Sequence, residues 1–357
     1  MVVQNFMKIF FETSSVLASY NLDLPKALSL NTRVIVDIEH PLLYAIYFYE
    51  KVLHKRYNFK TVPPCINKFT RTRHLRKVDV VHLNSLNTRL AREAKGLGKP
   101  VVAVLHAAPF PKEVYDNIND YVDVYVVPSN FTKYSEEAKI GSKKIVVIHH
   151  GVDMELFNPN IPREEARRKL GIPYNVKVIL WNDRISPEKD LECFIKAMEH
   201  VLREMKEAYV YIKGRAVVKD YYDKVKEPLK KLKETTKVKI HIGWIPHSKV
   251  PLLYRAADVF VRTSKHENFG LGAIEAMACG TPVVAPNATT FPEIIGDATT
   301  LYRPGDPLDL AEKTITLLTD RNLYDSVKKY QLTRVQKCFN IQHIAQMYLE
   351  LYSSLIK

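Results

Sequence analysis

The chain has 357 residues, more than one compact core usually holds, and this length predicts two domains. Hydrophobic residues make up 46% and charged residues 26%, a balance that excludes a disordered chain, a collagen-like fibre and a coiled coil. Lysine and arginine together number 53 against 39 aspartate and glutamate residues, so the net charge is +14. A field of that sign favours an anionic partner, such as a nucleic acid, anionic lipid headgroups or a phosphorylated small molecule.

The longest apolar run, residues 41–49, is far shorter than the roughly 20 residues that a membrane-spanning helix needs. Residues 1–15 show neither a charged n-region nor a small-residue cleavage site, so we expect no secretory signal. The four cysteines lie far apart and predict reduced, buried thiols rather than a disulfide framework or a zinc site: Cys65, Cys193, Cys279 and Cys338. Together these features predict a cytoplasmic protein.

Short apolar runs alternate with longer spacers along the whole chain. Six runs occur in the first half, at 8–14, 33–39, 79–85, 100–107, 122–129 and 144–150. Six more occur in the second half, at 176–182, 208–214, 238–244, 258–264, 281–286 and 299–303. Near-continuous Val and Ile runs suit strands buried on both faces of a parallel sheet, and the spacers are long enough for crossover helices. The pattern predicts two Rossmann-like α/β domains.

The stretch 150–164 has one glycine, two prolines and no periodicity, which predicts an exposed linker between the domains. An apolar helix is expected at the end of the chain, over 341–355. We therefore assign 1–155 to the first domain, 156–335 to the second and 336–357 to a final helical segment. Two facing α/β domains imply a cleft, with ligands at the carboxyl ends of the strands.

The positive charge is concentrated in residues 51–77, which hold nine lysines and arginines and no acidic residue. One interpretation is a solvated, partly irregular surface segment. The alternative is a membrane-binding surface, because the segment follows the apolar run 41–49 and because each cation near an anionic bilayer contributes about 1 kcal/mol. Apolar side chains alternate with these cations: Val52, Leu53, Tyr57, Phe59, Phe69 and Leu75.

The most informative segment is 257–286, where a strand leads through a polar loop into a helix that begins near Leu271. Gly280 is placed to end this helix. Gly270 and Gly272 carry no side chain at the helix start, where free backbone N–H groups can bind a phosphate. Such glycines also permit close packing of a helix on a sheet, so they do not by themselves establish a phosphate site.

Two carboxylates, Glu267 and Glu275, are eight residues apart in this segment and are expected at the same strand end. A carboxylate beside a phosphate is repelled unless it faces hydroxyl groups. Glu275 is therefore a candidate for binding a ribose diol, and Glu267 for binding a sugar beyond a diphosphate. The alternative for Glu275 is a charge near a helix N-terminus, stabilised by the helix dipole.

A second segment, WNDRISPEKD at 181–190, complements the first. Ser186 is the expected N-cap and Pro187 the first residue of the helix that follows. Arg184 and Lys189 flank that helix start, where two cations and the helix dipole would stabilise a diphosphate without a metal ion. The alternative is that both cations are ordinary surface charges. The sequence has no Asp-x-Asp pair to hold a metal ion on the diphosphate.

These motifs together resemble the signature of retaining nucleotide-sugar glycosyltransferases of family four, which have the GT-B fold. The resemblance rests on Arg184 and Lys189 and on Glu267-x7-Glu275 within HENFGLGAIEAMACGTPVVAP. VIHHGVDMELFNP, DVVHLNS and KPVVAVLHA are also similar to the family, and the likeness covers roughly 79–320. It implies two Rossmann-like domains whose parallel sheets face each other across a cleft, with the C-terminal helix packing back across both.

The resemblance also implies roles for individual residues. Arg184 and Lys189 would bind the diphosphate, and Glu275 the nucleotide ribose. Glu267 would meet the donor sugar, and the backbone of Phe269, Gly270 and Leu271 would contact the sugar and the phosphate.

In the first domain, His106 matches the family's histidine that approaches the donor sugar. The alternative for His106 is a strand-end histidine that is satisfied by the backbone, and His82 is expected to be a packed strand residue. Family members usually have a glycine-rich turn after the first strand, but here no glycine precedes Gly96. The corresponding place includes Ser14 and Ser15, whose hydroxyls would replace backbone N–H contacts with the ligand.

The resemblance implies a hexose-type sugar transferred with retention from a nucleoside diphosphate, UDP or GDP, to an acceptor hydroxyl, without cofactor or metal. A lipid-linked or otherwise anionic acceptor would place the enzyme at the inner face of the membrane. Three alternatives stay open: a nucleotide-sugar epimerase of GT-B-like fold, a non-catalytic nucleotide-sugar-binding protein, and a nucleic-acid-binding protein. Only the net charge favours the last, because the sequence contains no nucleic-acid-binding motif.

Overall fold

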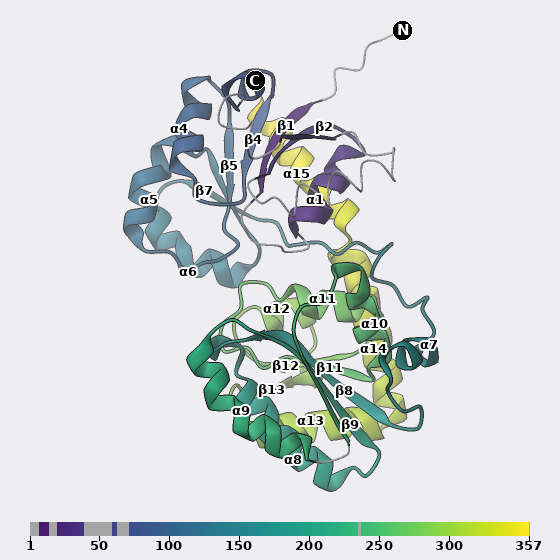
Figure 1. Cartoon of the computed structure of the whole chain (residues 1–357). Coiled ribbons are helices and arrows are strands. Elements are labelled where there is room, and N and C mark those ends of the chain that lie inside the picture. The colour runs from purple at the N-terminus through teal and green to yellow at the C-terminus, as the bar shows by residue number, and fades with distance from the viewer. Residues whose placement is uncertain (1–6, 14–19, 39–58, 63–70, 235–236, 357) are drawn as a thin grey trace. The chain divides into compact units, whose positions relative to one another are not determined.

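The chain forms two compact units (Figure 1). The computed structural model describes residues 7–13, 20–38, 59–62, 71–234 and 237–356. The first unit combines Met1–Gly151 with Asn340–Lys357, and the second is Val152–Phe339. The sequence prediction placed the corresponding divisions after residues 155 and 335.

The first unit contains a parallel sheet whose described strands are ordered β3-β2-β1-β4-β5-β6-β7. The strands are β1 Lys8–Thr13, β2 Arg33–Ile38, β3 Phe59–Val62, β4 Val80–Leu83, β5 Val101–Val104, β6 Val124–Val127 and β7 Lys144–Val147. The helices are α1 Tyr20–Ser29, α4 Thr88–Gly96, α5 Lys112–Ile118, η1 Asn119–Tyr121, α6 Asn130–Ile140 and α15 Ile341–Leu355. Strands β4, β5 and β6 are buried throughout, as their Val-rich sequences predict.

The six strands predicted in the first half are all present, but the expectation of six was wrong because β3 adds a seventh. It pairs in parallel with β2, with Val34 next to Phe59 and Asp37 next to Val62. This strand lies inside the basic segment 51–77, of which only 59–62 and 71–77 are among the described residues. Part of that segment is therefore sheet, not irregular surface.

The second unit contains a six-stranded parallel sheet ordered β10-β9-β8-β11-β12-β13. Its strands are β8 Lys177–Ile185, β9 Ala208–Ala216, β10 Val238–Ile242, β11 Val259–Val261, β12 Val283–Pro286 and β13 Leu301–Tyr302. All six correspond to predicted runs.

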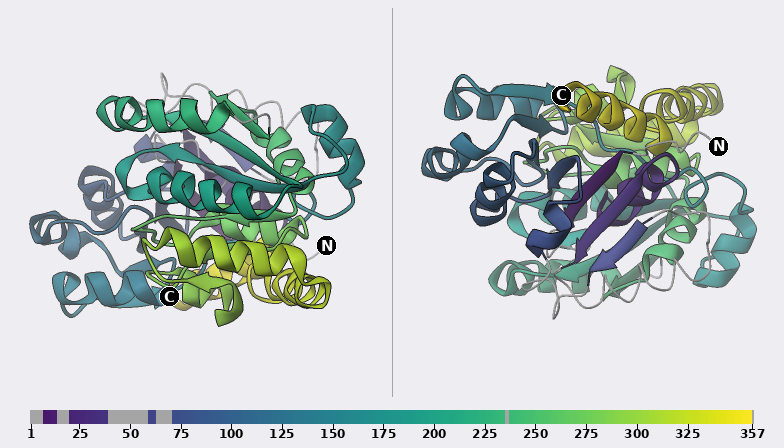
Figure 2. Two further views of the ribbon diagram at one scale, coloured as in Figure 1. Left: turned by 90° about the horizontal axis from the view of Figure 1, so that it is seen from below. Right: turned by 90° about the horizontal axis from the view of Figure 1, so that it is seen from above.

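Helices cover both faces of this second sheet (Figures 1 and 2). The longer ones are α7 Arg163–Leu170, α8 Leu191–Glu204, α9 Lys219–Lys233, α11 Leu271–Ala278, α13 Pro307–Thr319 and α14 Arg321–Cys338. The shorter ones are η2 Pro187–Lys189, η3 His247–Lys249, α10 Val250–Ala256, α12 Phe291–Ile295 and η4 Ala298–Thr300. Leu180 and Phe260 belong to the core on one face, whereas Ile179 and Trp181 belong to the core on the other.

The stretch 150–164 is not the exposed linker that was predicted. Phe157 is fully buried in the core of the second unit, where its ring packs against His247 and Tyr254. Val152 belongs to the same core, and α7 begins at Arg163. The few apolar side chains of a stretch without periodicity are thus used for packing.

The chain passes between the units twice, and the two passages lie together within each unit. In the first unit, a Cβ added to Gly151 would come within 2.6 Å of the Ile341 Cα. In the second, the Val152 N–H donates to the Phe339 carbonyl at 2.8 Å. The predicted C-terminal helix is α15, and it buries Tyr348 and Tyr352 in the core of the first unit.

The cysteines were expected to be reduced, buried thiols. Cys193 and Cys279 are free and buried as predicted, whereas Cys338 is partly exposed and Cys65 lies outside the described residues. Burial raises the pKa of Cys193 to about 12.

Among the helices that the structure describes, none has the length and apolar character required to cross a membrane.

We expect Phe157→Ala to lower the free energy of unfolding by about 3–5 kcal/mol, because it leaves a cavity in a packed core. Tyr174→Ala is the control, since the Tyr174 side chain in the same unit is 53% exposed and its truncation should change stability by no more than about 0.5 kcal/mol. Urea unfolding measures both. Equal, small effects would contradict the packing role of Phe157.

Candidate active site

In each sheet the strand order reverses once, between β1 and β4 in the first unit and between β8 and β11 in the second. Chains leaving neighbouring strands at such a reversal run to opposite faces of the sheet. The carboxyl ends of these strands therefore border a crevice, which is the usual ligand site of open α/β sheets. Both reversals carry a cluster of polar side chains.

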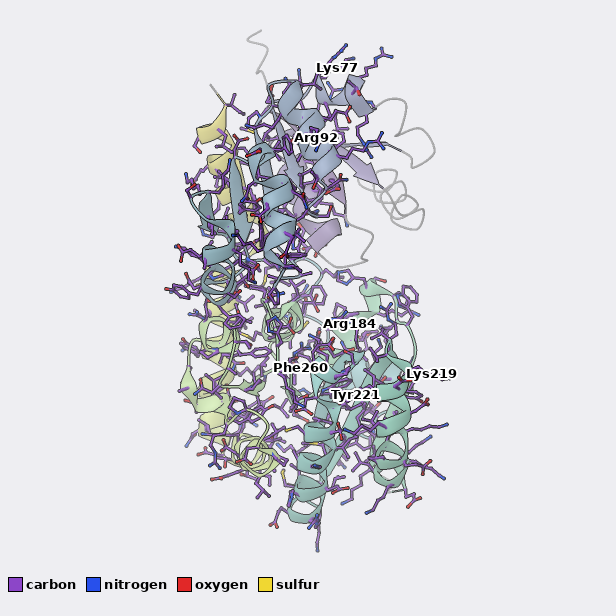
Figure 3. All side chains as sticks on the ribbon, turned by 90° about the vertical axis from the view of Figure 1, so that its left-hand side faces the viewer. Lys77, Arg92, Arg184, Lys219, Tyr221 and Phe260 are labelled. Atoms are coloured by element: carbon purple, nitrogen blue, oxygen red, sulfur yellow. The ribbon has the colours of Figure 1, made fainter. Side chains whose placement is uncertain are left out.

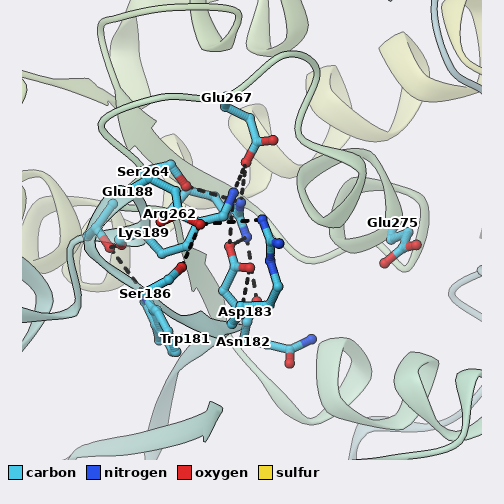
Figure 4. A network of polar contacts seen from close by, with 12 residues as sticks. Trp181, Asn182, Asp183, Ser186, Glu188, Lys189, Arg262, Ser264, Glu267 and Glu275 are labelled. Carbon is cyan, nitrogen blue, oxygen red and sulfur yellow. Dashed lines mark hydrogen bonds and ion pairs between the residues drawn. The ribbon is translucent and has the colours of Figure 1, made fainter. Parts of the chain in front are cut away.

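The cluster in the second unit is a buried network of four charged groups (Figure 4). Arg262 follows β11. Its Nη1 lies 2.6 Å from Asp183, and its Nη2 donates to Glu267 at 2.7 Å. The Lys189 Nζ lies 2.7 Å from the same Glu267 oxygen, Oε2, and 3.8 Å from Asp183. Arg262 and Lys189 are each about 5% exposed. The network thus pairs two buried cations with two carboxylates at the ends of adjacent strands.

Burial alone would raise the pKa of Glu267, but the neighbouring charges of Lys189 and Arg262 hold that pKa below its usual value. Burial would likewise lower the pKa of Arg262, yet the charges of Asp183 and Glu267 raise it. Both groups are therefore ionised at neutral pH. Glu267 can accept hydrogen bonds there but has no proton to donate.

The turn that carries Lys189 differs from the prediction in one respect. Ser186 and Pro187 do begin a helical turn, but it is the short 3-10 helix η2, and α8 starts only at Leu191. Asp190, in the left-handed region with φ 45°, caps α8 by accepting from the Cys193 N–H. Lys189 therefore lies before the helix rather than in its first turn. The turn is held to the segment after β11, because the Thr263 hydroxyl donates to the Lys189 carbonyl at 2.7 Å.

The two predicted diphosphate cations have different environments. The Arg184 side chain is 54% exposed and lies 3.4 Å from Glu188. Lys189 is buried and pairs with Glu267, so it is not the ordinary surface charge of the alternative interpretation. Both candidate cations are thus ion-paired, Arg184 at the surface with Glu188 and Lys189 in the interior with Glu267.

The helix α11 begins at Leu271, as predicted, directly after Gly270, whose φ of 86° is available to glycine at no steric cost. Gly280 has φ 71° and follows the helix end, also as predicted. A Cβ on Gly272 would lie 3.2 Å from the Tyr254 hydroxyl and 3.6 Å from Arg262, so glycine there lets the helix approach both. Phe269 is buried and packs against Phe339.

Glu275 and Glu267 were both expected at one strand end, but they lie in different surroundings. Glu275 is buried in α11 and accepts a hydrogen bond of 3.0 Å from the Tyr254 hydroxyl. Burial, and then the Glu275 charge, raise the pKa of Tyr254 well above its ordinary value, so Tyr254 remains a donor. Glu275 lies apart from the Arg262 network (Figure 4). The two carboxylates thus mark separate parts of the site.

The cluster in the first unit is built on Glu12, at the end of β1. Its carboxylate accepts from the Ser85 N–H at 3.2 Å, the Ser85 hydroxyl at 2.9 Å and the Asn87 amide at 2.9 Å. The Asn84 amide donates to the Glu12 carbonyl at 2.8 Å. Ser14 and Ser15, the predicted ligand contacts beyond β1, lie outside the described residues.

A chain of hydrogen bonds connects His106 to the C-terminal helix. The Asn84 Oδ1 lies 2.8 Å from His82 Nε2 and 3.0 Å from His106 Nε2. His106 Nδ1 lies 3.3 Å from His150 Nε2, and His82 Nδ1 lies 2.5 Å from the Tyr352 hydroxyl. His82 is a buried strand residue, as predicted, and His106 is partly exposed.

The hydrogen-bond partners determine which ring nitrogen of each histidine carries the proton. Because the Glu12 carbonyl can only accept, the Asn84 amide nitrogen must face it, and Oδ1 accepts from Nε2–H of both histidines. His106 Nδ1 is then an acceptor and His150 Nε2 its donor, while His82 Nδ1 accepts from Tyr352. Burial, followed by the neighbouring histidines, lowers the pKa of His106 well below 6.5. Burial lowers the pKa of His82 to about 3. Both rings are therefore neutral.

Sequence reasoning missed Asp183, Arg262 and Tyr254 in the second unit, and Glu12 and Asn84 in the first. Arg262 left a signal, since a lone arginine at the end of an apolar strand must find a buried partner.

The described residues contain no group of three or more His, Cys, Asp or Glu side chains that could hold a metal ion.

Two family models match the chain in adjacent regions. The model described as Glycosyl transferases group 1 matches residues 162–334, which include the Arg262 network and Glu275. The model described as Glycosyltransferase Family 4 matches residues 34–156, which include the histidine chain. Together the two matches cover most of the chain.

Curated relatives share about a third of the aligned residues. The lipopolysaccharide core mannosyltransferase LpsB of Rhizobium meliloti is 29% identical over 59% of this chain and 61% of its own length. The D-inositol 3-phosphate glycosyltransferase of Streptomyces bingchenggensis is 34% identical over 50% of this chain and 41% of its own length. The chain thus spans less than two thirds of each of these relatives.

Solved structures match the whole chain. Anabaena Alr3699/HepE, in complex with UDP and glucose, has a TM-score of 0.82 at 21% identity, covering 98% of this chain and 100% of that one. A glycosyltransferase from Rickettsia africae has a TM-score of 0.83 at 22% identity, covering 99% of both chains. At these identities the likeness shows the fold, and it confirms the GT-B prediction. Because the two family models together match 34–156 and 162–334, the chain belongs to the group 1, family 4 glycosyltransferases.

Proposed function

We propose that the protein is a retaining glycosyltransferase that moves a hexose-type sugar from a nucleoside diphosphate to an acceptor hydroxyl without a metal ion. The observation that carries the proposal is the Arg262 network, which places cations and an ionised carboxylate together at the strand reversal of the second unit. A diphosphate requires the cations, and a sugar hydroxyl requires the carboxylate. UDP bound to Anabaena Alr3699/HepE supports a nucleotide-sugar donor of this kind.

Arg184 and Lys189 are proposed to stabilise the leaving diphosphate. As the bond between the anomeric carbon and the diphosphate breaks, negative charge grows on the phosphate oxygens, and two nearby cations lower the energy of that state. Arg184 is exposed, and a phosphate would compete only with its surface partner Glu188. Lys189 must first exchange Glu267 for a phosphate oxygen. The acceptor oxygen then bonds to the same face of the anomeric carbon and gives its proton to the departing diphosphate.

The two glutamates are proposed to bind hydroxyl groups of the donor. Glu275 would accept from the ribose diol, with its carboxylate oriented by the Tyr254 hydroxyl at 3.0 Å. Glu267 uses Oε2 for both cations, so Oε1 would accept from a hydroxyl of the transferred sugar. The backbone of Phe269, Gly270 and Leu271 would contact the sugar and phosphate at the start of α11.

His106 is proposed to approach the donor sugar, on the basis of the family resemblance. Its neutral ring suits hydrogen bonding rather than proton transfer at neutral pH. To bond with a sugar hydroxyl through Nδ1, His106 must release the His150 N–H that now donates to it at 3.3 Å.

The acceptor is proposed to be anionic or lipid-linked, with the first unit binding an anionic membrane surface. Among the described residues, five exposed cations support this proposal: Arg73, Arg76, Lys77, Arg89 and Arg92. Figure 3 labels Lys77 and Arg92 on this unit. The rival account is that these charges only increase solubility and that the acceptor is a free sugar or a protein.

A nucleotide-sugar epimerase and a non-catalytic binding protein are separated from a transferase by one assay. The purified protein is incubated with a panel of nucleotide sugars, with and without candidate acceptors. A transferase forms a glycosylated product only when the acceptor is present. Epimerisation or hydrolysis of the donor alone would favour the epimerase, and donor binding without any turnover would favour the binding protein.

We expect Arg184→Ala to lower kcat by roughly 10²–10³ because a cation on the leaving diphosphate is lost, with stability unchanged because the side chain is exposed. Lys189→Ala should lower kcat similarly and also destabilise the fold, since it removes a buried ion pair. Lys224→Ala is the control, because Lys224 is an exposed cation on α9 whose ion-pair partner is Glu192. Losses below a few-fold at saturating donor would exclude this assignment.

Because lysine and arginine are proposed to neutralise the diphosphate, chelation of divalent cations should leave the transfer rate essentially unchanged. Initial rates are compared with and without excess EDTA. A rate abolished by EDTA and restored by Mg²⁺ or Mn²⁺ would show that a metal ion stabilises the leaving group instead.

The protein should co-sediment with liposomes that contain anionic lipid, and this binding should weaken steeply as salt rises. Neutralising Arg73, Arg76 and Lys77 should reduce binding. Neutralising the exposed Lys226, Lys231 and Lys233 on α9 is the matched control and should not. If the wild type ignores anionic liposomes at low salt, the membrane proposal fails and the transferase proposal is unaffected.

A further inference from the structure

Arg262 joins both carboxylates of the buried network. Its Nη1 lies 2.6 Å from Asp183 Oδ2, and its Nη2 lies 2.7 Å from Glu267 Oε2. Nη2 also donates to the Ser264 hydroxyl at 3.2 Å. A guanidinium is planar and rigid, so its two amino groups hold two carboxylates at a set separation and orientation, which an ammonium group does not do.

Lys189 and Arg262 bond to the same oxygen of Glu267. If a phosphate draws Lys189 away, Glu267 therefore keeps one charged partner, and its other oxygen keeps its direction. Without Arg262, the departure of Lys189 would leave Glu267 and Asp183 as two buried carboxylates with no cation between them. Arg262 thus makes the partner exchange of Lys189 feasible.

We propose that Arg262 is a positioning residue for sugar transfer: it orients Glu267 toward the donor sugar and releases Lys189 to the diphosphate. This inference rests on the proposed function. The simpler alternative is that Arg262 only neutralises the buried Asp183 charge and has no effect on the reaction beyond keeping the second unit folded.

Three variants separate these accounts: Arg262→Met, Asp183→Asn and the double variant. Arg262→Met alone leaves two buried carboxylates with one lysine, so its unfolding midpoint should fall markedly. The double variant retains one cation, Lys189, and one anion, Glu267, so the charge balance and most of the lost midpoint should return. Asn has nearly the same shape as Asp, so Asp183→Asn removes the charge of this side chain with little change in its volume.

A matched control exists at the other end of β11. Arg167 is as buried as Arg262, and its Nη2 lies 2.6 Å from Asp258, which precedes the strand. The double variant Arg167→Met/Asp258→Asn removes a buried ion pair in the same unit, away from the carboxyl ends of the strands. It also takes the Asp258 charge from Arg163, whose Nη1 lies 2.7 Å from that carboxylate. It should lower the midpoint while the folded protein keeps its kcat within about 3-fold, as expected for a distant structural site.

The readouts are the unfolding midpoint, kcat and the KM for the nucleotide sugar. Positioning by Arg262 predicts that the double variant refolds but stays roughly 10- to 100-fold low in kcat. Arg262→Lys, which keeps the charge without the rigid fork, should also stay low. A double variant with kcat near that of the wild type would overturn the positioning role and leave the proposed function standing. A wild type that transfers sugar from no nucleotide sugar would overturn both.

Discussion

Burial of both faces of each parallel sheet is the constraint on which the site depends. With helices on either side, the strands offer polar groups only at their ends, and only where the strand order reverses does a crevice open there. The protein uses both of its reversals. One carries cations and carboxylates in balance around Arg262, and the other carries Glu12 with neutral hydrogen-bond donors. The reversal in the second unit thus presents paired cations and carboxylates, whereas the described part of the first presents a carboxylate and imidazoles.

Each cluster solves the problem of buried charge differently. In the second unit, ion pairs compensate the desolvation of four charged groups, and under the proposed function a phosphate would replace Glu267 as the partner of Lys189. In the first unit, Asn84 hydrogen-bonds to two neutral histidines and to the Glu12 carbonyl, so this chain of hydrogen bonds contains no charged group that needs an ionic partner. The ionic cluster is thus suited to exchange, and the neutral chain to holding one arrangement.

Sequence patterns predicted most of this fold because buried parallel strands are continuous Val and Ile runs. The strand β3 escaped because Phe59–Val62 lies among lysines and arginines, where charge hides a short apolar pattern. The glycines at the ends of α11 were placed correctly, since their backbone requirements are local, whereas Ser186 and Pro187 begin a short 3-10 helix instead of α8. The contacts between side chains were not predicted. The sequence could place Lys189 and Glu267 at strand ends, but their contact depends on which strands become neighbours. For the same reason, Arg262 was passed over as part of its strand.

The arrangement of the two passages has a consequence for how the chain folds. The second unit is one continuous segment inserted into the first, and its ends meet where Val152 bonds to Phe339. All of its residues precede α15 in the chain, so its core can close before that helix is available. The first unit must wait, because α15 supplies Tyr348 and Tyr352 to a core that began with β1. The unit that begins second in the chain can therefore be the first to complete its core, and the face of the first sheet that α15 covers stays open until that helix docks.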